Sequence, residues 1–291
     1  MLADQRPSAE GGDEGGDEAR RSASALGIPV APAALAASLV VAVPGTSGDW
    51  LVSPDGRNLE HMTTTLITGA NKGLGFETAR QLSAAGHTVY VGSRDAERGR
   101  RAAERLGVRW VPLDITDDAS VEAAAKTIEA DGGLDILVNN AGVEERTPDM
   151  SVLGPSEITV DIMRKTFETN VFGLVRVTNA FLPLLGRSAA PVVVNVSSGL
   201  GSLTQTAAYP YPGVAYPASK AAVNMITVQY AKAFPNMRIN AVDPGFTATD
   251  LNGRAGTQTV EEGAEIIVRM AQVGADGPTG GYFAASGPVA W

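Results

Sequence analysis

The sequence predicts an α/β fold in which a doubly wound parallel sheet carries helices on both faces, within a single domain. Short runs rich in Val, Ile, Leu and Thr alternate with segments of helical length from residue 63 to the C-terminus. Strands and helices that alternate in this way are typical of parallel sheets with right-handed crossovers. The first strand, residues 63–68, runs into three glycines and then into an amphipathic segment at residues 77–85.

These glycines, Gly69, Gly73 and Gly75, have the spacing G-x-x-x-G-x-G between a strand and a helix. Gly69 lets the chain leave the strand at a backbone angle closed to other residues, and Gly73 and Gly75 let the backbone approach a pyrophosphate. The helix N-terminus adds free N–H groups and a positive dipole end. The turn is therefore a candidate phosphate site of a Rossmann-type fold, and an ordinary glycine-rich turn is the alternative.

Further elements follow at regular intervals. We expect strands at residues 88–94, 108–113, 134–138, 191–196, 238–242 and 280–285. We expect helices at residues 95–106, 121–130, 161–185, 216–234 and 260–272. A ligand of a parallel sheet lies outside the carboxyl ends of the strands, where Gly69, Arg94, Asp114 and Asn139 all fall.

The end of the second strand indicates which cofactor would bind. Cofactors without a 2′-phosphate are usually held by an Asp or Glu at this position, whereas the phosphorylated form needs a cation. Here the strand ends in Ser93 and Arg94, and Lys72 lies inside the glycine turn. Two cations that converge on one phosphate favour NADPH, although both could also be solvated surface charges.

Composition excludes several classes of site. The chain has 291 residues, no cysteine and only two histidines, His61 and His87, so disulfides, thiolate metal sites and His-rich metal sites are not expected. We expect no metal, and a reducing, cytoplasmic location. Of the net charge of −9, residues 1–61 carry −5, which leaves −4 for residues 62–291. This mild acidity argues against a nucleic-acid binder.

Residues 1–61 differ from the rest of the chain. Residues 1–24 have little to bury, and Pro29 and Pro32 interrupt the apolar run at residues 25–43, so neither a signal peptide nor a membrane span is favoured. We predict that residues 1–61 are a disordered or non-native N-terminal extension. In that case Met62 is the natural start, and residues 62–291 form an NADP-binding, Rossmann-type reductase domain.

An ordered set of motifs identifies a family. The glycine turn, Asn139-Asn140-Ala141-Gly142, Asn170, Ser198, Tyr216-x-x-x-Lys220 and Asp243-Pro244-Gly245 occur in the order and roughly at the intervals of the short-chain dehydrogenase/reductase family. From residue 64 to the C-terminus the chain resembles that family. It is most similar to the NADPH-dependent carbonyl reductase branch, by its Ala-Asn-Lys-Gly turn, its Ser-Arg strand end and its Gly-Pro-Val-Ala-Trp ending.

This resemblance implies an oxidoreductase that transfers hydride from NADPH to a ketone or aldehyde carbonyl, or catalyses the reverse alcohol oxidation. Tyr216 would be the proton donor. Lys220, one helical turn along the same face, would lower the pKa of Tyr216 and hold the ribose. Ser198 would donate a hydrogen bond to the substrate oxygen, and Asn170 would hold a water behind Lys220.

The resemblance and the strand ends together nominate the cofactor site. We expect NADPH to contact Gly69, Asn71, Lys72, Gly73, Leu74, Gly75, Ser93, Arg94, Asp114, Ile115, Asn140, Ala141, Gly142, Tyr216, Lys220, Pro244, Gly245 and Thr247. We expect the other ligand to be a small carbonyl or alcohol substrate, with no nucleic acid or membrane partner.

Some features depart from the family pattern. Ser198 and Tyr216 lie 18 positions apart, more than is usual, so the segment between them carries a small insertion. Relatives often pair through the helices after Ser198, so a homo-oligomer is possible, and the insertion makes it less certain. A serine hydrolase is not favoured, because neither His61 nor His87 is placed to serve as its base and the residues around Ser198 lack a G-x-S-x-G elbow. Two other functions stay open: an NADP(H)-binding sensor without turnover, and an epimerase or dehydratase of the same family.

Overall fold

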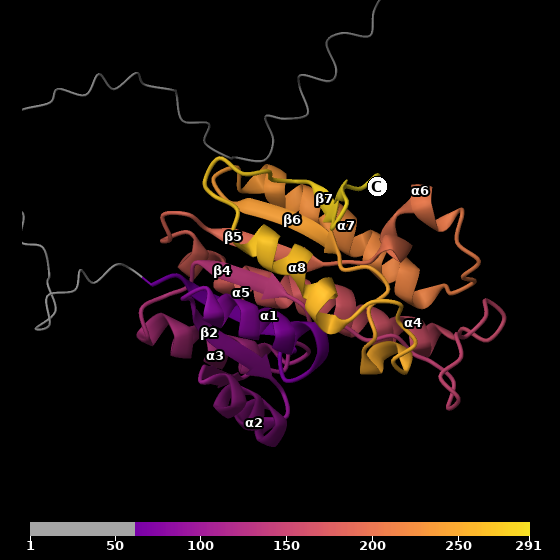
Figure 1. Ribbon diagram of the computed structural model, residues 1–291, viewed down its shortest axis with the longest axis horizontal. Coiled ribbons are helices and arrows are strands. Elements are labelled where there is room, and N and C mark those ends of the chain that lie inside the picture. The colour runs from indigo at the N-terminus through magenta and orange to yellow at the C-terminus, as the bar shows by residue number, and fades with distance from the viewer. Residues whose placement is uncertain (1–61) are drawn as a thin grey trace, which may run out of the picture. The chain divides into compact units, whose positions relative to one another are not determined.

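The computed structural model describes residues 62–291. The predictions about residues 1–61 lie outside the described residues. The centre of the described part is one eight-stranded sheet with the order β3-β2-β1-β4-β5-β6-β7-β8 (Figure 1). Its strands are β1 (Thr64–Thr68), β2 (Thr88–Ser93), β3 (Arg109–Pro112), β4 (Ile136–Asn139), β5 (Val192–Val196), β6 (Arg238–Asp243), β7 (Tyr282–Ala284) and β8 (Gly287–Pro288).

Helices cover both faces of this sheet. They are α1 (Gly73–Ala84), α2 (Ala96–Leu106), α3 (Asp118–Ala130), α4 (Val160–Phe167), α5 (Leu174–Leu185), α6 (Leu203–Thr206), α7 (Ala215–Ala233) and α8 (Val260–Ala271). Helix α1 packs against α8, whereas α3 packs against α5. The prediction of a doubly wound, Rossmann-type sheet is confirmed.

The alternation of side chains along β1 explains the two layers. Successive residues of a strand point to opposite faces. Leu66 accordingly lies in a cluster with residues of α3 and α5, such as Ile128 and Phe181, while Ile67 lies in a second cluster with residues of α1 and α8, such as Leu82 and Ile267. All are fully buried. A strand that is apolar on both faces therefore specifies a central position in a three-layer fold.

Three local features differ from the sequence prediction. Residues 280–285 were expected to hold the last strand, and β7 lies there, but the chain then turns back and β8 pairs antiparallel with β7. The helix expected at residues 161–185 contains a π-helical turn, η2 (Glu168–Gly173), between α4 and α5. No helix was expected between Ser198 and Tyr216, but α6 lies there.

The order of the strands places a ligand site. Strands β1 and β4 are neighbours although β2, β3 and their helices come between them in the chain, so the crossovers run to opposite sides from this point. A crevice forms at such a switch point, beyond the carboxyl ends of the strands.

Within residues 62–291, none of the helices has the length and apolar character that a membrane crossing requires.

Candidate active site

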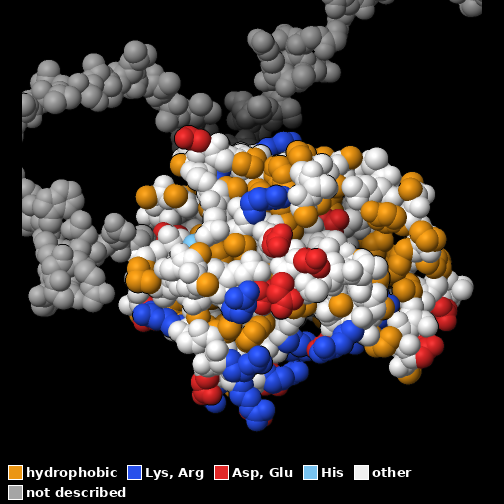
Figure 2. All heavy atoms as spheres, in the orientation of Figure 1, with side chains coloured by type: hydrophobic (Ala, Val, Ile, Leu, Met, Phe, Trp, Pro, Cys, Tyr) orange, Lys and Arg blue, Asp and Glu red, His pale blue; other side chains and the backbone are white. Residues whose placement is uncertain are grey.

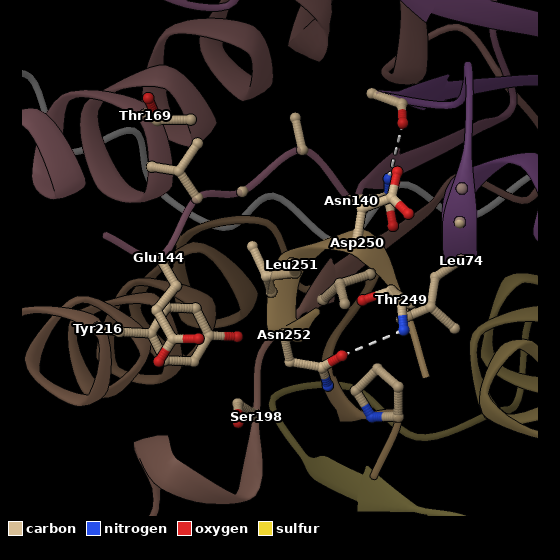
Figure 3. A pocket seen from close by; sticks show the side chains of 18 of the residues that line it. Leu74, Asn140, Glu144, Thr169, Ser198, Tyr216, Thr249, Asp250, Leu251 and Asn252 are labelled. Carbon is tan, nitrogen blue, oxygen red and sulfur yellow. Dashed lines mark hydrogen bonds between the residues drawn. The ribbon is translucent and has the colours of Figure 1, made fainter. Parts of the chain in front are cut away.

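A cavity of about 1060 Å³ opens at the carboxyl ends of the strands. This volume lies slightly above the usual range for ligand pockets, about 300–1,000 Å³. Residues from the loops after β1, β2, β3, β4, β5 and β6 line it, together with Tyr216 and Lys220 of α7 (Figure 3). Every residue predicted to bind cofactor or to act in catalysis lines this cavity except Asn170.

The glycine turn fits a pyrophosphate. Gly69 and Gly73 have φ values of +66° and +58°, in the left-handed region that favours glycine. A Cβ at Gly75 would lie 2.4 Å from the Asn140 side-chain nitrogen, so only glycine fits there. The N-terminus of α1 has no side-chain cap, and Gly73, Leu74 and Gly75 line the cavity. Its N–H groups are therefore free to bind an anion.

The loops after β1 and β4 are fixed to each other. The Thr68 hydroxyl accepts hydrogen bonds from the backbone N–H groups of Asn140 and Ala141, each 3.0 Å long. The Asn140 amide donates to the Thr68 carbonyl at 2.8 Å. A Cβ at Gly69 would lie 3.0 Å from the Ala141 Cα, so the two backbones are in close contact. The Asn-Asn-Ala-Gly motif thus closes one wall of the crevice.

The nucleotide end of the cavity is basic. Exposed Arg94 lines it, and so does Arg98, which the sequence analysis missed and which forms an ion pair with Asp95. Figure 2 shows Lys and Arg side chains gathered around the position of α2, whose sequence holds four arginines. Lys72 also lines the cavity, but its ammonium pairs with Asp250 at 3.0 Å. A 2′-phosphate would have to compete with Asp250 for Lys72.

Tyr216, Lys220 and Ser198 lie together at the other end. Tyr216 and Lys220 are on one face of α7, and the Lys220 Nζ lies 5.5 Å from the centre of the Tyr216 ring. Ser198 follows β5, and its side chain lies near enough to the Tyr216 phenol to lower the pKa of that phenol, while its hydroxyl accepts a 3.3 Å hydrogen bond from the Leu200 N–H. Its carbonyl accepts a 2.6 Å hydrogen bond from the buried Tyr282. The end of β5 therefore brings Ser198 to the phenol.

Charge around the phenol differs from the expectation. Lys220 was expected to lower the pKa of Tyr216, but burial first, then the carboxylates of Glu144 and Asp243, raise that pKa, and the lowering influence of the Ser198 side chain only partly offsets this. Burial lowers the pKa of Lys220 to about 8. The Lys220 ammonium donates a 2.8 Å hydrogen bond to the Val196 carbonyl, which fixes its position.

Asn170 lies behind the cavity wall, in the π-helical turn η2. Its side-chain oxygen accepts a 2.8 Å hydrogen bond from the Val143 N–H, and its nitrogen donates to the Val143 carbonyl and to Ser219, both at 2.9 Å. A Cβ at Gly142 would lie 3.4 Å from the Asn170 oxygen and 3.6 Å from the Lys220 Nζ. Asn170 therefore ties the loop after β4 to α7 beside Lys220.

Three further residues line the cavity that the sequence analysis missed: Glu144, Arg146 and Tyr211. The Tyr211 hydroxyl and the Arg146 guanidinium both donate to the buried Glu144 carboxylate. Two features of the sequence could have indicated these residues. One is the charged run directly after the Asn-Asn-Ala-Gly motif, and the other is the Tyr-Pro-Tyr sequence inside the insertion.

A serine hydrolase would need a histidine beside Ser198. Within residues 62–291 the single histidine, His87, comes directly before β2, at the amino end of a parallel strand. Ser198 comes directly after β5, at the opposite edge of the sheet. His87 bonds to the Thr65 hydroxyl at 2.9 Å instead. The described residues thus offer no base for Ser198 of the hydrolase kind.

Residues 63–259 match the family model described as short chain dehydrogenase. A (+)-neomenthol dehydrogenase from Capsicum annuum is 32% identical over 295 residues, which cover 75% of this chain and 94% of that protein. A salutaridine reductase from Papaver bracteatum is 33% identical over 292 residues, covering 76% and 94%. Among solved structures, salutaridine reductase from Papaver somniferum has a TM-score of 0.68 and 30% identity, covering 77% of this chain and all of that one.

The chain therefore belongs to the short-chain dehydrogenase/reductase family. A menthone neomenthol reductase structure from Mentha piperita, with a TM-score of 0.65, 32% identity and coverage of 77% and 99%, agrees with this. The predicted family and the predicted class of enzyme, a short-chain dehydrogenase/reductase, are confirmed.

Proposed function

We propose that this enzyme reduces a ketone or aldehyde carbonyl with NADPH, or oxidises the corresponding alcohol in reverse, with Tyr216 as the proton donor. The observation that carries the proposal is the position of Tyr216, Ser198 and Lys220 around one end of a cavity whose other end is a glycine turn at a helix N-terminus. Similar proteins named as a neomenthol dehydrogenase and a salutaridine reductase support the reaction class.

The residues of this chain would hold NADPH along the strand ends. The N–H groups of α1 and the glycine turn suit the pyrophosphate. Arg94, at the end of β2, suits the 2′-phosphate, and Lys220 suits the ribose beside the nicotinamide. Asp114, Asn140 and the loop after Pro244 line the walls between these points. When bound, NADPH supplies the hydride for the carbonyl carbon.

Negative charge grows on the carbonyl oxygen as that carbon is reduced, so the site must supply a proton and hydrogen bonds there. Tyr216 would donate the proton, because its phenol is protonated at neutral pH: burial raises its pKa above the usual range. Ser198 would donate a hydrogen bond to the same oxygen. After the transfer, Lys220 would return a proton to the phenolate of Tyr216 through the ribose and a water held near Asn170.

The boundaries of the working domain are also part of the proposal. The family model covers residues 63–259, and relatives that match nearly all of their own length cover about three quarters of this chain. This supports residues 62–291 as the catalytic domain.

Phe172 and Met225 are more than half exposed, and a second copy of the chain would cover such apolar side chains. The homo-oligomer and the cytoplasmic location stay predictions.

The test is oxidation of NADPH against a panel of aldehydes, ketones and quinones, with NADH in parallel. We expect at least one carbonyl compound to be reduced, with NADPH preferred. NADPH binding without turnover of any compound would instead favour the sensor. Conversion of a substrate into a product without net oxidation of NADPH would favour the epimerase or dehydratase.

A further inference from the structure

The proposed chemistry does not use Glu144 and Asp243, the two carboxylates of the cavity lining that raise the pKa of Tyr216. Glu144 comes from the loop after β4, and Asp243 is the last residue of β6. They therefore approach the phenol from a loop and from the end of a neighbouring part of the sheet. The proposed phosphates occupy the opposite, basic end near Arg94, so neither carboxylate is needed to bind them. Both remain available to contact the substrate.

Glu144 is held rigidly. Its side chain is only 6% exposed. One carboxylate oxygen accepts from the Tyr211 hydroxyl, and the other accepts from Arg146 Nε at 2.8 Å and Nη2 at 2.6 Å. In Figure 3 the Glu144 side chain extends from the loop after β4 toward Tyr216, and both residues line the cavity. A charge fixed by packed partners keeps its place when a substrate arrives, so it can act as a recognition group.

Arg146 does not cancel this charge at the phenol. Its Nη1 turns away to the Met150 carbonyl at 2.9 Å. After burial, Glu144 is the largest influence that raises the pKa of Tyr216, and it exceeds the opposing influence of Arg146. Glu144 therefore acts on the phenol as a negative neighbour even with Arg146 bound to it.

Asp243 adds to this negative influence. Its Oδ1 accepts a 2.9 Å hydrogen bond from the Gly245 N–H. Its Oδ2 lies against Gly199, where an added Cβ would come within 2.9 Å of it. Among residues 62–291, no Lys, Arg or His forms an ion pair with Asp243. No cationic side chain of the described residues therefore neutralises this carboxylate through an ion pair.

We infer that the substrate end of the cavity selects carbonyl compounds that bear a protonated amine or another hydrogen-bond donor, and rejects those that bear a carboxylate, with Glu144 as the determinant. This inference rests on the proposed function. A carboxylate substrate placed beside Glu144 and Asp243 would meet like charges in a partly buried site, where screening by salt is weak. A protonated amine would gain the opposite interaction.

The experiment compares three acetophenones that carry a para aminomethyl, methyl or carboxylate group, at pH 7.5 with saturating NADPH. For the unmodified enzyme we expect kcat/KM for the carboxylate probe at least about tenfold below that for the aminomethyl probe, as one like charge in a partly buried site would give. If these probes turn over too slowly, their inhibition constants against a carbonyl compound from the panel give the same ranking.

Glu144→Gln keeps the shape and an acceptor for Tyr211 while it removes the charge. We expect this variant to reduce the ratio between the two charged probes by about tenfold, mainly through the KM of the carboxylate probe. Asp243→Asn should reduce the ratio independently. Glu265→Gln, an exposed residue of α8 outside the cavity, is the control for net charge and should leave the ratio unchanged.

The outcomes separate the inference from the proposed function. Equal kcat/KM for the two charged probes, or a ratio that Glu144→Gln and Asp243→Asn leave unchanged while NADPH binding and melting temperature are normal, would overturn the inference alone. Failure of the enzyme to reduce any carbonyl compound with NADPH would overturn the proposed function, and the inference with it.

Discussion

The Lys220 Nζ lies 5.5 Å from the centre of the Tyr216 ring and donates a 2.8 Å hydrogen bond to the Val196 carbonyl. One turn of α7 and the end of β5 thus hold a phenol and an ammonium at fixed separation. Burial lowers the pKa of Lys220 to about 8, so the ammonium is costly to keep in the folded protein. The buried ammonium therefore lowers the stability of the folded protein, and it lies where the proposed proton transfer requires a charge.

Lys220→Met should therefore stabilise the cofactor-free protein near pH 7 while it abolishes turnover. Between pH 8 and about 10 the unfolded chain still binds this proton and the folded protein does not, so the free energy of unfolding of the unmodified protein rises with pH over that range. The advantage of the variant, about 1–3 kcal/mol at pH 7, should shrink toward pH 10. Urea unfolding at several pH values measures it.

Lys232→Met is the matched control, because Lys232 is exposed in the last turn of the same helix. Its stability difference from the unmodified protein should stay within about 0.5 kcal/mol at every pH. A Lys220→Met variant that is less stable than the unmodified protein at pH 7 would show that the Lys220 ammonium is well solvated or paired.

Arg94→Asp should weaken NADPH far more than NADH. A charge-assisted contact to phosphate contributes about 1.5–3 kcal/mol, so the ratio of the two dissociation constants should change at least about tenfold. Asp250→Asn should have the opposite effect on NADPH, because it releases Lys72 from its ion pair. Titration of cofactor fluorescence measures both. Equal losses for NADPH and NADH in Arg94→Asp would mean that Arg94 does not reach the phosphate.

Asn170→Ala should lower kcat and also destabilise the protein. It removes the acceptor for the Val143 N–H and the donor to Ser219, and an unpaired buried group costs about 1–3 kcal/mol. Thermal unfolding and steady-state kinetics measure the two effects. Asn179→Ala, at an exposed position of α5 where Asn179 accepts from Tyr230, is the control and should keep full activity. A normal kcat in Asn170→Ala would remove Asn170 from the proposed relay.

A chain that starts at Met62 should fold and have the full activity of residues 1–291. The reason is that β1 begins at Thr64 and the family match begins at residue 63. Side-by-side kcat/KM and melting temperature measure this. Loss of activity in the shortened chain would show that residues 1–61 contribute to the enzyme.

The part of the site that could be predicted consists of residues whose backbone conformation or place at a strand end follows directly from the sequence pattern. Gly69 and Gly73 need left-handed φ values, and the strand ends that carry Arg94, Asp114 and Ser198 share one edge of any parallel sheet. These features are local or follow from topology, so a single sequence was sufficient to place them.

What could not be predicted depends on contacts between distant segments. The ion pair of Lys72 with Asp250 spans 178 positions, and the bond of Tyr211 to Glu144 spans 67. No periodicity links such residues in advance. The π-helical turn that holds Asn170 is only six residues long, so it barely changes the spacing of the apolar residues along the helix. The sequence therefore predicted one continuous helix.

The most direct measurement is the single-turnover rate of hydride transfer in Tyr216→Phe with saturating NADPH and a carbonyl compound from the panel. If Tyr216 donates the proton, the variant should bind NADPH with the dissociation constant of the unmodified enzyme and reduce the carbonyl about 10²–10⁴-fold more slowly. A rate within a few-fold of the unmodified enzyme would contradict the account, because another group would then be protonating the substrate oxygen.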